Sequence, residues 1–179
     1  YNGAQFENYR SNRQDSSSIT NPVIRQIFEE NKNILWITTD YGINRFNIAT
    51  KKFQPYYLGY KDKETFREHS FLATRNSEGL ILAASYKSGI YKFNTKSEDF
   101  EPFPIPEIDK NNIIQLFFDS SDNLWIVNDK NEIFRLKIKS DKITEKQKIT
   151  PPADFLHLCY DKKEKIWFQY ENYTLGYYS

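Results

Sequence analysis

The residues best suited to nucleophilic chemistry in this chain are Cys159 and His157, which stand two positions apart. In a strand, alternate side chains share a face, so a Cys–His dyad is conceivable there. The neighbouring Leu156 and Leu158 favour the other interpretation, in which Cys159 is a small buried hydrophobe of the core. The second histidine, His69, is far away in the sequence, so no metal-ligand spacing arises. We therefore expect no catalytic residue, metal or cofactor in this segment, and no enzyme activity.

Carboxylates recur at one kind of position, in a polar turn six residues before a tryptophan. These residues are Glu30, Asp119 and Asp161. The segment 119–123 resembles a calcium-binding loop faintly, but it lacks the glycine and the distant glutamate of that motif. The equivalent turn of another copy holds Lys32. A carboxylate at a tight turn can accept backbone N–H bonds, so we predict a structural role for all three.

The tryptophans themselves mark a repeat. Trp36, Trp125 and Trp167 each follow an aliphatic residue, and a fourth copy appears if Leu82 takes the tryptophan position and Asn76 the carboxylate position. Successive copies then lie 42 to 46 residues apart, a period typical of propeller blades and other repeat arrays. Because the tryptophans sit inside apolar runs, we predict that they pack between neighbouring sheets and do not stack on sugars.

Each copy is expected to form short antiparallel strands separated by polar turns, with no helix. The runs are rich in β-branched and aromatic residues, and Gly42 and Gly89 mark the entry to third strands. Four short strands per repeat is the composition of a propeller blade. The sequence thus predicts an all-β propeller segment over residues 1–179. Its expected parts are an orphan outer strand within 1–10, blades at 20–60, 66–105 and 110–147, and an incomplete blade at 153–179.

The overall charge balance excludes some classes of partner. The chain has 25 Lys and Arg against 24 Asp and Glu, a formal net charge of +1, so no long-range field attracts nucleic acid or an anionic membrane. No apolar run approaches the roughly 18 residues that cross a bilayer. We expect a membrane connection only through a longer chain. The same repeat position in three third strands is occupied by Arg45, Lys92 and Arg135. These side chains either form a ladder for an anionic ligand or lay their aliphatic stems over a blade.

The first copy, residues 24–47, resembles the two-component regulator propeller repeat. The matching features are the Ile-rich strand, the acidic turn, Asn-Ile-Leu-Trp36-Ile-Thr-Thr, and then Gly42-Ile-Asn-Arg-Phe-Asn47. The third copy matches over 119–126, the second lacks the tryptophan, and the fourth has no glycine at its second turn. The resemblance implies the periplasmic region of a hybrid two-component sensor of the kind found in Bacteroidetes. It also implies a homodimer, oligosaccharide ligands from glycan breakdown, and a membrane helix and histidine kinase elsewhere in the receptor.

The two ends of the chain allow two arrangements. Phe6-Glu-Asn-Tyr9 has the aromatic-x-x-aromatic pattern of the fourth strands, and the last copy lacks a fourth strand. In a closed ring of four blades this segment would pair with 175–178. In an open arc it would instead complete a preceding blade. Since propellers of the resembled family have more blades than four, we predict the arc, as part of a propeller of about seven blades.

A ligand is expected on one rim of the propeller, where the loops between successive blades meet the loops between second and third strands. Aromatic, amide and charged side chains on positioned loops suit carbohydrate recognition. The predicted ligand-binding residues are Tyr41, Arg67, Tyr86, Lys87, Lys130 and Tyr170. Two alternatives stay open: a structural or protein-interaction propeller without a small ligand, and a propeller-type glycan lyase or hydrolase.

Overall fold

A computed structural model describes residues 6–58, 70–85, 88–108, 112–151, 153–161 and 165–178. These residues form strands, turns and irregular segments, with no helix among them. Sheet 1 contains β1 (Ile24–Asn31), β2 (Ile34–Thr39), β3 (Gly42–Asn47) and β4 (Lys52–Tyr56). Sheet 2 contains β5 (Phe71–Arg75), β6 (Ile81–Ser85), β7 (Gly89–Asn94) and β8 (Asp99–Pro102). Sheet 3 contains β9 (Ile113–Phe118), β10 (Asn123–Asn128), β11 (Ile133–Lys139) and β12 (Lys142–Ile149). Sheet 4 contains β13 (Phe155–Tyr160), β14 (Ile166–Tyr170) and β15 (Leu175–Tyr178).

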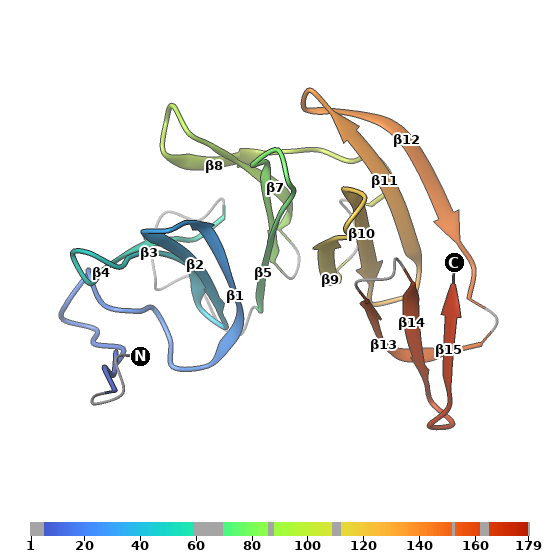
Figure 1. The fold of residues 1–179 in the computed structure, drawn as a ribbon, viewed down its shortest axis with the longest axis horizontal. Helices are drawn as coiled ribbons and strands as arrows, with labels where there is room; N and C mark the ends of the chain where they lie inside the picture. Colours follow the sequence, from blue (N-terminus) through green and yellow to red (C-terminus); the bar gives the residue numbers. More distant parts are fainter. Residues whose placement is uncertain are drawn as a thin grey trace.

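Each sheet is an antiparallel meander whose strands follow the order of the chain. Figure 1 shows the four sheets spread along an arc, with sheet 1 at one end and sheet 4 at the other. The first strands β1, β5, β9 and β13 face the inside of this arc, and the later strands fan outward. This arrangement confirms the predicted all-β propeller architecture, in which each sheet is a blade. The total of about seven blades stays a prediction.

Hydrophobic side chains from facing sheets form three successive cores. Sheets 1 and 2 enclose Trp36, Tyr56, Phe93 and Phe100, whose ring centroids lie 4.9 to 5.7 Å apart in tilted and edge-to-face pairs. Sheets 2 and 3 enclose an aliphatic core around Leu82, and sheets 3 and 4 enclose one around Trp125. Sheets 2 and 3 each bury one face against the sheet before and one against the sheet after, so repeated sheet-on-sheet burial holds the arc together.

The residues in the tryptophan position differ in burial according to what covers them. Trp36 and Trp125 are 0% and 2% exposed because sheets 2 and 4 cover them, and Leu82 is equally buried against sheet 3. Trp167, which we expected to be buried in the same way, is only partly buried. It lies on the face of sheet 4 that points away from sheet 3, where no described sheet packs.

The N-terminal segment departs from the predicted orphan strand. Residues 1–5 lie outside the described residues, and residues 6–10 are not in a strand. Tyr9 instead packs edge to face against Phe46 and Phe53, with ring centroids 4.9 and 5.6 Å apart. Ile19 joins the same cluster, which lies on the face of sheet 1 opposite Trp36. The aromatic-x-x-aromatic pattern therefore serves packing onto a sheet here, and not strand pairing.

The closed-ring arrangement is absent from the described part of the chain. Sheet 4 has three strands, and no described strand pairs with the outer edge of β15. Its outward face carries a row in which Cys159, Trp167 and Tyr177 stand side by side across three strands. Leu175 on the same strand is 70% exposed and Tyr177 is 55% exposed. Large apolar side chains are therefore exposed on this face of sheet 4 in the described part of the chain.

We expect the isolated 179-residue chain to self-associate through this face, because burying it removes apolar surface from water. Light scattering coupled to size exclusion should show oligomers for the native sequence. The double variant Leu175→Lys with Tyr177→Lys should shift the chain toward the monomer, whereas Ile48→Lys, at an exposed turn of sheet 1, should not. A native chain that is monodisperse and monomeric at tens of micromolar would contradict this expectation.

Candidate functional site

The meander places alternate turns on opposite rims of the arc. On one rim, here called the entry rim, the turn between second and third strands is bonded to the connection that leads into the same sheet. The N–H groups of Asp40, Asp129 and Glu171 donate to the carbonyl oxygens of Val23, Asn112 and Asp154, at 3.3, 2.9 and 3.4 Å. On the opposite rim the first and third turns meet, as shown by the Ile48 N–H bond to the Asn33 carbonyl at 2.9 Å. The loops that lead into a blade and the loops between second and third strands therefore share one rim, as predicted.

Three of the six predicted binding residues can be placed. Tyr41 is 37% exposed on the β2–β3 turn, and Lys130 is exposed on the β10–β11 turn of the same rim. Tyr170 ends β14, where its ring stacks 6.2 Å from Phe168 and covers Gly176. A Cβ at Gly176 would lie 2.7 Å from the Tyr170 ring, so this tyrosine has a packing role that the sequence did not indicate.

The remaining predicted residues, Arg67, Tyr86 and Lys87, lie outside the described residues. Tyr41, Lys130 and Tyr170 belong to sheets 1, 3 and 4, and no contact joins them in the described part of the chain. Gly42 and Gly89 begin β3 and β7 with φ of +145° and +79°. At Gly42 an added Cβ would approach the Tyr56 carbonyl oxygen to 3.1 Å, so only glycine fits that turn.

Polar groups of the entry rim already bind one another. The Asp40 carboxylate accepts a hydrogen bond from Arg25 Nε at 2.5 Å and another from the Ser70 hydroxyl at 3.3 Å. Asp129 accepts one from the Asn112 side-chain amide at 2.5 Å. These bonds fix the loops, and among the three predicted residues that can be placed, Tyr41 and Lys130 have exposed side chains available to a ligand.

The carboxylates of the polar turns have a partner that sequence reasoning missed. Glu30, Asp119 and Asp161 each accept the indole N–H of the tryptophan six residues later, at 2.8, 2.8 and 2.9 Å. The predicted backbone bonds are also present for Asp119, which accepts the Asn123 N–H at 2.9 Å, and for Asp161, which accepts the Lys165 N–H at 3.1 Å. The constant six-residue offset to a side-chain donor was the available signal.

A cation stands opposite the tryptophan position in three sheets. Arg45 pairs across the strands with Trp36, and its guanidinium holds both oxygens of Glu30 at 2.9 Å. The hydrogen bond to Glu30 raises the pKa of Arg45 above its ordinary value. Arg45 also reaches Glu98 of sheet 2 at 3.6 Å. In sheet 2, Lys92 binds Asp141 of sheet 3 at 2.7 Å.

The third member of this set, Arg135, lies over the Trp125 ring with its guanidinium carbon 6.0 Å from the ring centroid. The side chains of Arg45 and Lys92 thus join one sheet to the next, and Arg135 packs on the tryptophan of its own sheet. This geometry favours the structural interpretation of the three cations over a ladder for an anionic ligand.

The conceivable Cys–His dyad is not formed. Cys159 and Leu156 are exposed, contrary to the expected core positions. Cys159 stands beside Trp167 on the outward face, and a register irregularity between Phe155 and His157 interrupts the alternation at Leu156, while Leu158 is buried against sheet 3. The Nδ1 atom of His157 lies 2.7 Å from the side-chain nitrogen of Gln115, and no hydrogen bond links His157 to Cys159.

The described residues lack two further features. They contain no group of three or more His, Cys, Asp or Glu side chains that could hold a metal. Nor do they contain a helix long and apolar enough to cross a bilayer.

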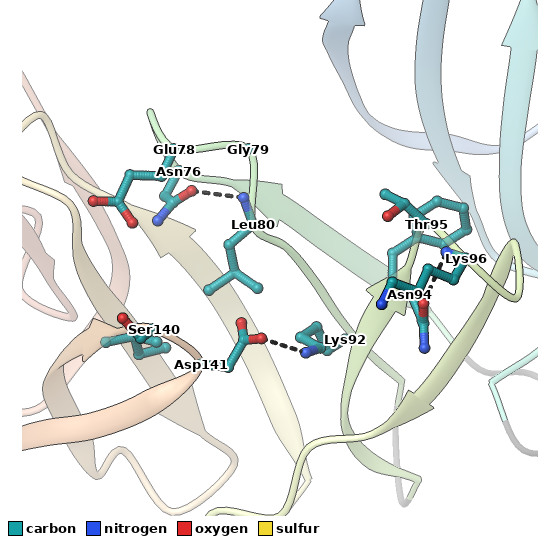
Figure 2. Close-up of a pocket in the computed structure, with 12 residues that line it drawn as sticks. Asn76, Glu78, Gly79, Leu80, Lys92, Asn94, Thr95, Lys96, Ser140 and Asp141 are labelled. Atoms are coloured by element: carbon teal, nitrogen blue, oxygen red, sulfur yellow. Dashed lines mark hydrogen bonds and ion pairs between the residues drawn. The ribbon is translucent and has the colours of Figure 1, made fainter.

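A cavity of about 480 Å³ opens on the rim opposite the entry rim, between sheets 2 and 3. Its walls come from the β5–β6 turn, the β7–β8 turn and the β11–β12 turn (Figure 2). Polar side chains there include Glu78, Lys92, Lys96, Ser140 and Asp141. The sequence analysis placed the ligand on the other rim and did not anticipate this cavity.

Comparison with known proteins identifies the fold. No family model and no curated protein matches the chain. Among solved structures, the extracellular domain of a candidate hybrid two-component system from B. thetaiotaomicron superposes with a TM-score of 0.64 at 22% identity, over 92% of this chain and 22% of that one. A second such extracellular domain from B. thetaiotaomicron gives 0.65 at 15% identity, over 88% and 21%. Virginiamycin B lyase from Staphylococcus aureus gives 0.59 at 20% identity, over 90% and 58%.

These similarities establish the propeller fold. The chain spans about a fifth of the length of the two extracellular domains, so it corresponds to a small part of larger propellers. Propellers of sensor domains and of an enzyme both match, and the fold alone does not choose between them.

The burial difference between Trp36 and Trp167 leads to a paired stability prediction. Trp36→Ala should cost about 3–5 kcal/mol of unfolding free energy, because it leaves a cavity between two sheets. Trp167→Ala should cost clearly less, because its ring is already partly in water. Denaturant unfolding of the isolated chain at low concentration, followed by circular dichroism, measures both. Equal losses for the two variants would contradict the described packing.

Proposed function

We propose that this chain is part of the ligand-sensing propeller of a hybrid two-component receptor, on the periplasmic face of an inner membrane. The observation that supports this most directly is the combination of the repeat motif in residues 24–47 with the fold of two extracellular domains of such systems. The partners in this proposal are the rest of the receptor chain and a second copy of it. The kinase activity would reside in other parts of the receptor.

The hydrogen bonds of the repeat motif in residues 24–47 fit a rigid blade that supports loops. Trp36 and Arg45 are held by Glu30, and Asn44 is fully buried, bonding Thr20 through both its side-chain oxygen and its nitrogen. These bonds fix the frame of the blade from within. The sequence of the rim loops is then free to vary with the ligand.

For the ligand we propose an oligosaccharide from glycan breakdown. The exposed Tyr41 ring offers an apolar face of the kind that packs on sugar rings, and Lys130 offers hydrogen-bond donors on the same rim. Tyr86, Lys87 and Arg67, which the sequence places in loops of this rim, complete the proposed set.

Two other functions have specific support. The exposed apolar face of Leu175 and Tyr177 favours a structural or protein-interaction role. The fold similarity to virginiamycin B lyase is compatible with a propeller enzyme, although His157 and Cys159 do not form a dyad in this chain. Release of a cleaved product from a bound glycan would establish the enzyme.

Glycan-array screening of the intact protein tests the proposal, followed by calorimetric titration of the best ligand. Replacing Tyr41, Tyr86, Lys87 or Lys130 with alanine should weaken binding several-fold and leave the melting temperature nearly unchanged. The reason at Tyr41 and Lys130 is that exposed side chains contribute little to stability. Ile48→Ala, at an exposed position on the other rim, is the matched control. An array without any bound glycan would contradict the sensing role, and unchanged affinity in all four variants would contradict the entry-rim site.

A further inference from the structure

Sheet 2 departs from its neighbours at each of three linked positions. Where sheet 1 has Glu30, Trp36 and Arg45 bonded together, sheet 2 has Asn76, Leu82 and Lys92. The register is the same, since Leu82 pairs across the strands with Lys92 as Trp36 does with Arg45. Leu82 has no indole N–H to donate. The Asn76 amide and the Lys92 ammonium cannot form the bidentate pair that Glu30 and Arg45 form.

The cavity between sheets 2 and 3 lies where this tryptophan-centred assembly is missing. Asn76 and Lys92, the counterparts of Glu30 and Arg45, both line it. In the interface between sheets 1 and 2 the corresponding space is filled by the Trp36 ring, which packs on Phe93 and Phe100 at 4.9 and 5.6 Å. Leu82 is buried in the core below and does not line the cavity, whereas a tryptophan at this position would reach the side chain of residue 76 as Trp36 reaches Glu30.

The walls of the cavity present both hydrogen-bond donors and hydrogen-bond acceptors. The Asn76 oxygen accepts the Leu80 N–H at 2.7 Å, while its side-chain nitrogen has no partner among the described residues and points toward the space beside Ser140 (Figure 2). Asn76 is 4% exposed, so this donor is held in place. Lys92 and Asp141 meet at 2.7 Å across the cavity floor. Their ion pair offers donors and an acceptor side by side.

The charges that line the cavity cancel. Lys92 and Lys96 contribute two positive charges, and Glu78 and Asp141 contribute two negative charges. A site with no net charge does not favour an anionic ligand over a neutral one. Thr95 and Ser140 add hydroxyls, and Leu80 and Ile138 are the aliphatic residues of the lining.

We propose that this inter-sheet cavity binds a neutral, hydroxyl-rich ligand of one or two sugar units. Sugar hydroxyls donate and accept at once, which suits a wall of alternating ammonium, carboxylate, amide and hydroxyl groups. A volume of about 480 Å³ is within the range of small-molecule sites. The inference rests on the proposed sensing function, and it adds to the entry-rim site a second site on the rim opposite Tyr41 and Lys130.

A ligand in this position would bind both sheets at once. Sheets 2 and 3 are already joined on this rim by the Asp122 carboxylate, which accepts hydrogen bonds from the N–H and the hydroxyl of Ser77. A ligand that spans Asn94 and Asp141 adds to this connection. Occupancy of the cavity should therefore stiffen the interface between two blades, which gives a binding event a structural consequence.

The first test blocks the cavity without changing the core. Thr95 lines the cavity on the β7–β8 turn, and Ile48 is its counterpart on the equally long β3–β4 turn of sheet 1. We expect Thr95→Trp to weaken binding of neutral disaccharides (maltose, cellobiose and lactose as probes) at least tenfold in the intact protein. Ile48→Trp should bind as the native protein does. Digalacturonate serves as the anionic comparator and should bind more weakly than the best neutral probe.

The second test rebuilds the assembly of sheet 1 in sheet 2. The triple variant Asn76→Asp, Leu82→Trp, Lys92→Arg should fill the cavity, abolish disaccharide binding and retain a cooperative melting transition. If the rebuilt protein does not fold, the Thr95→Trp pair decides the matter alone. Native affinity in Thr95→Trp, tighter binding of digalacturonate than of every neutral probe, or no binding of any probe by the native protein would overturn the proposal. Native affinity in Thr95→Trp together with loss of binding in Tyr41→Ala would overturn this site while leaving the sensing function intact.

Discussion

The hydrogen bond between a turn carboxylate and a tryptophan indole is the interaction on which the rest of this structure depends. A tryptophan between two sheets supplies a large apolar surface, but its N–H must find a partner there. Asp119 supplies that partner to Trp125 from within the same hairpin, at 2.8 Å. The bond fixes the ring in one orientation within its own sheet, and sheet 4 covers the ring.

The two ends of the arc show that this bond is local and that burial is a separate step. Trp167 keeps its bond to Asp161 although its ring is only partly covered. At the other end, Tyr9 and Ile19 cover the face of sheet 1 that has no described sheet before it. The carboxylate–indole bond therefore forms within a single blade, and the neighbouring blade buries the tryptophan ring. Sheet 2 lacks the tryptophan together with the carboxylate and the guanidinium, and their counterparts Asn76 and Lys92 line the cavity beside sheet 3.

Much of the fold could be predicted because each blade needs particular residue types at fixed positions of the repeat. These are Trp36 and its equivalents, the turn carboxylates and Gly42. Features set by three-dimensional context could not. The pattern of Phe6 and Tyr9 has the same appearance whether the segment pairs with a strand or packs on a sheet. The exposure of Cys159 depends on whether another sheet follows. For the candidate site, the sequence located the loops of the entry rim and showed Asn76 and Leu82 in place of the carboxylate and the tryptophan of the repeat. The cavity could not be predicted, because it depends on how sheet 3 packs on sheet 2.

A double-mutant cycle on Asp119 and Trp125 tests the central role of the carboxylate–indole bond most directly. The unfolding free energies of Asp119→Ala, Trp125→Phe and the double variant give the coupling between the two side chains, separate from the backbone bonds that Asp119 also accepts. We predict a coupling of about 1.5–3 kcal/mol, the range of a hydrogen bond to a charged group. Additive losses, with a coupling within about 0.3 kcal/mol of zero, would contradict the account.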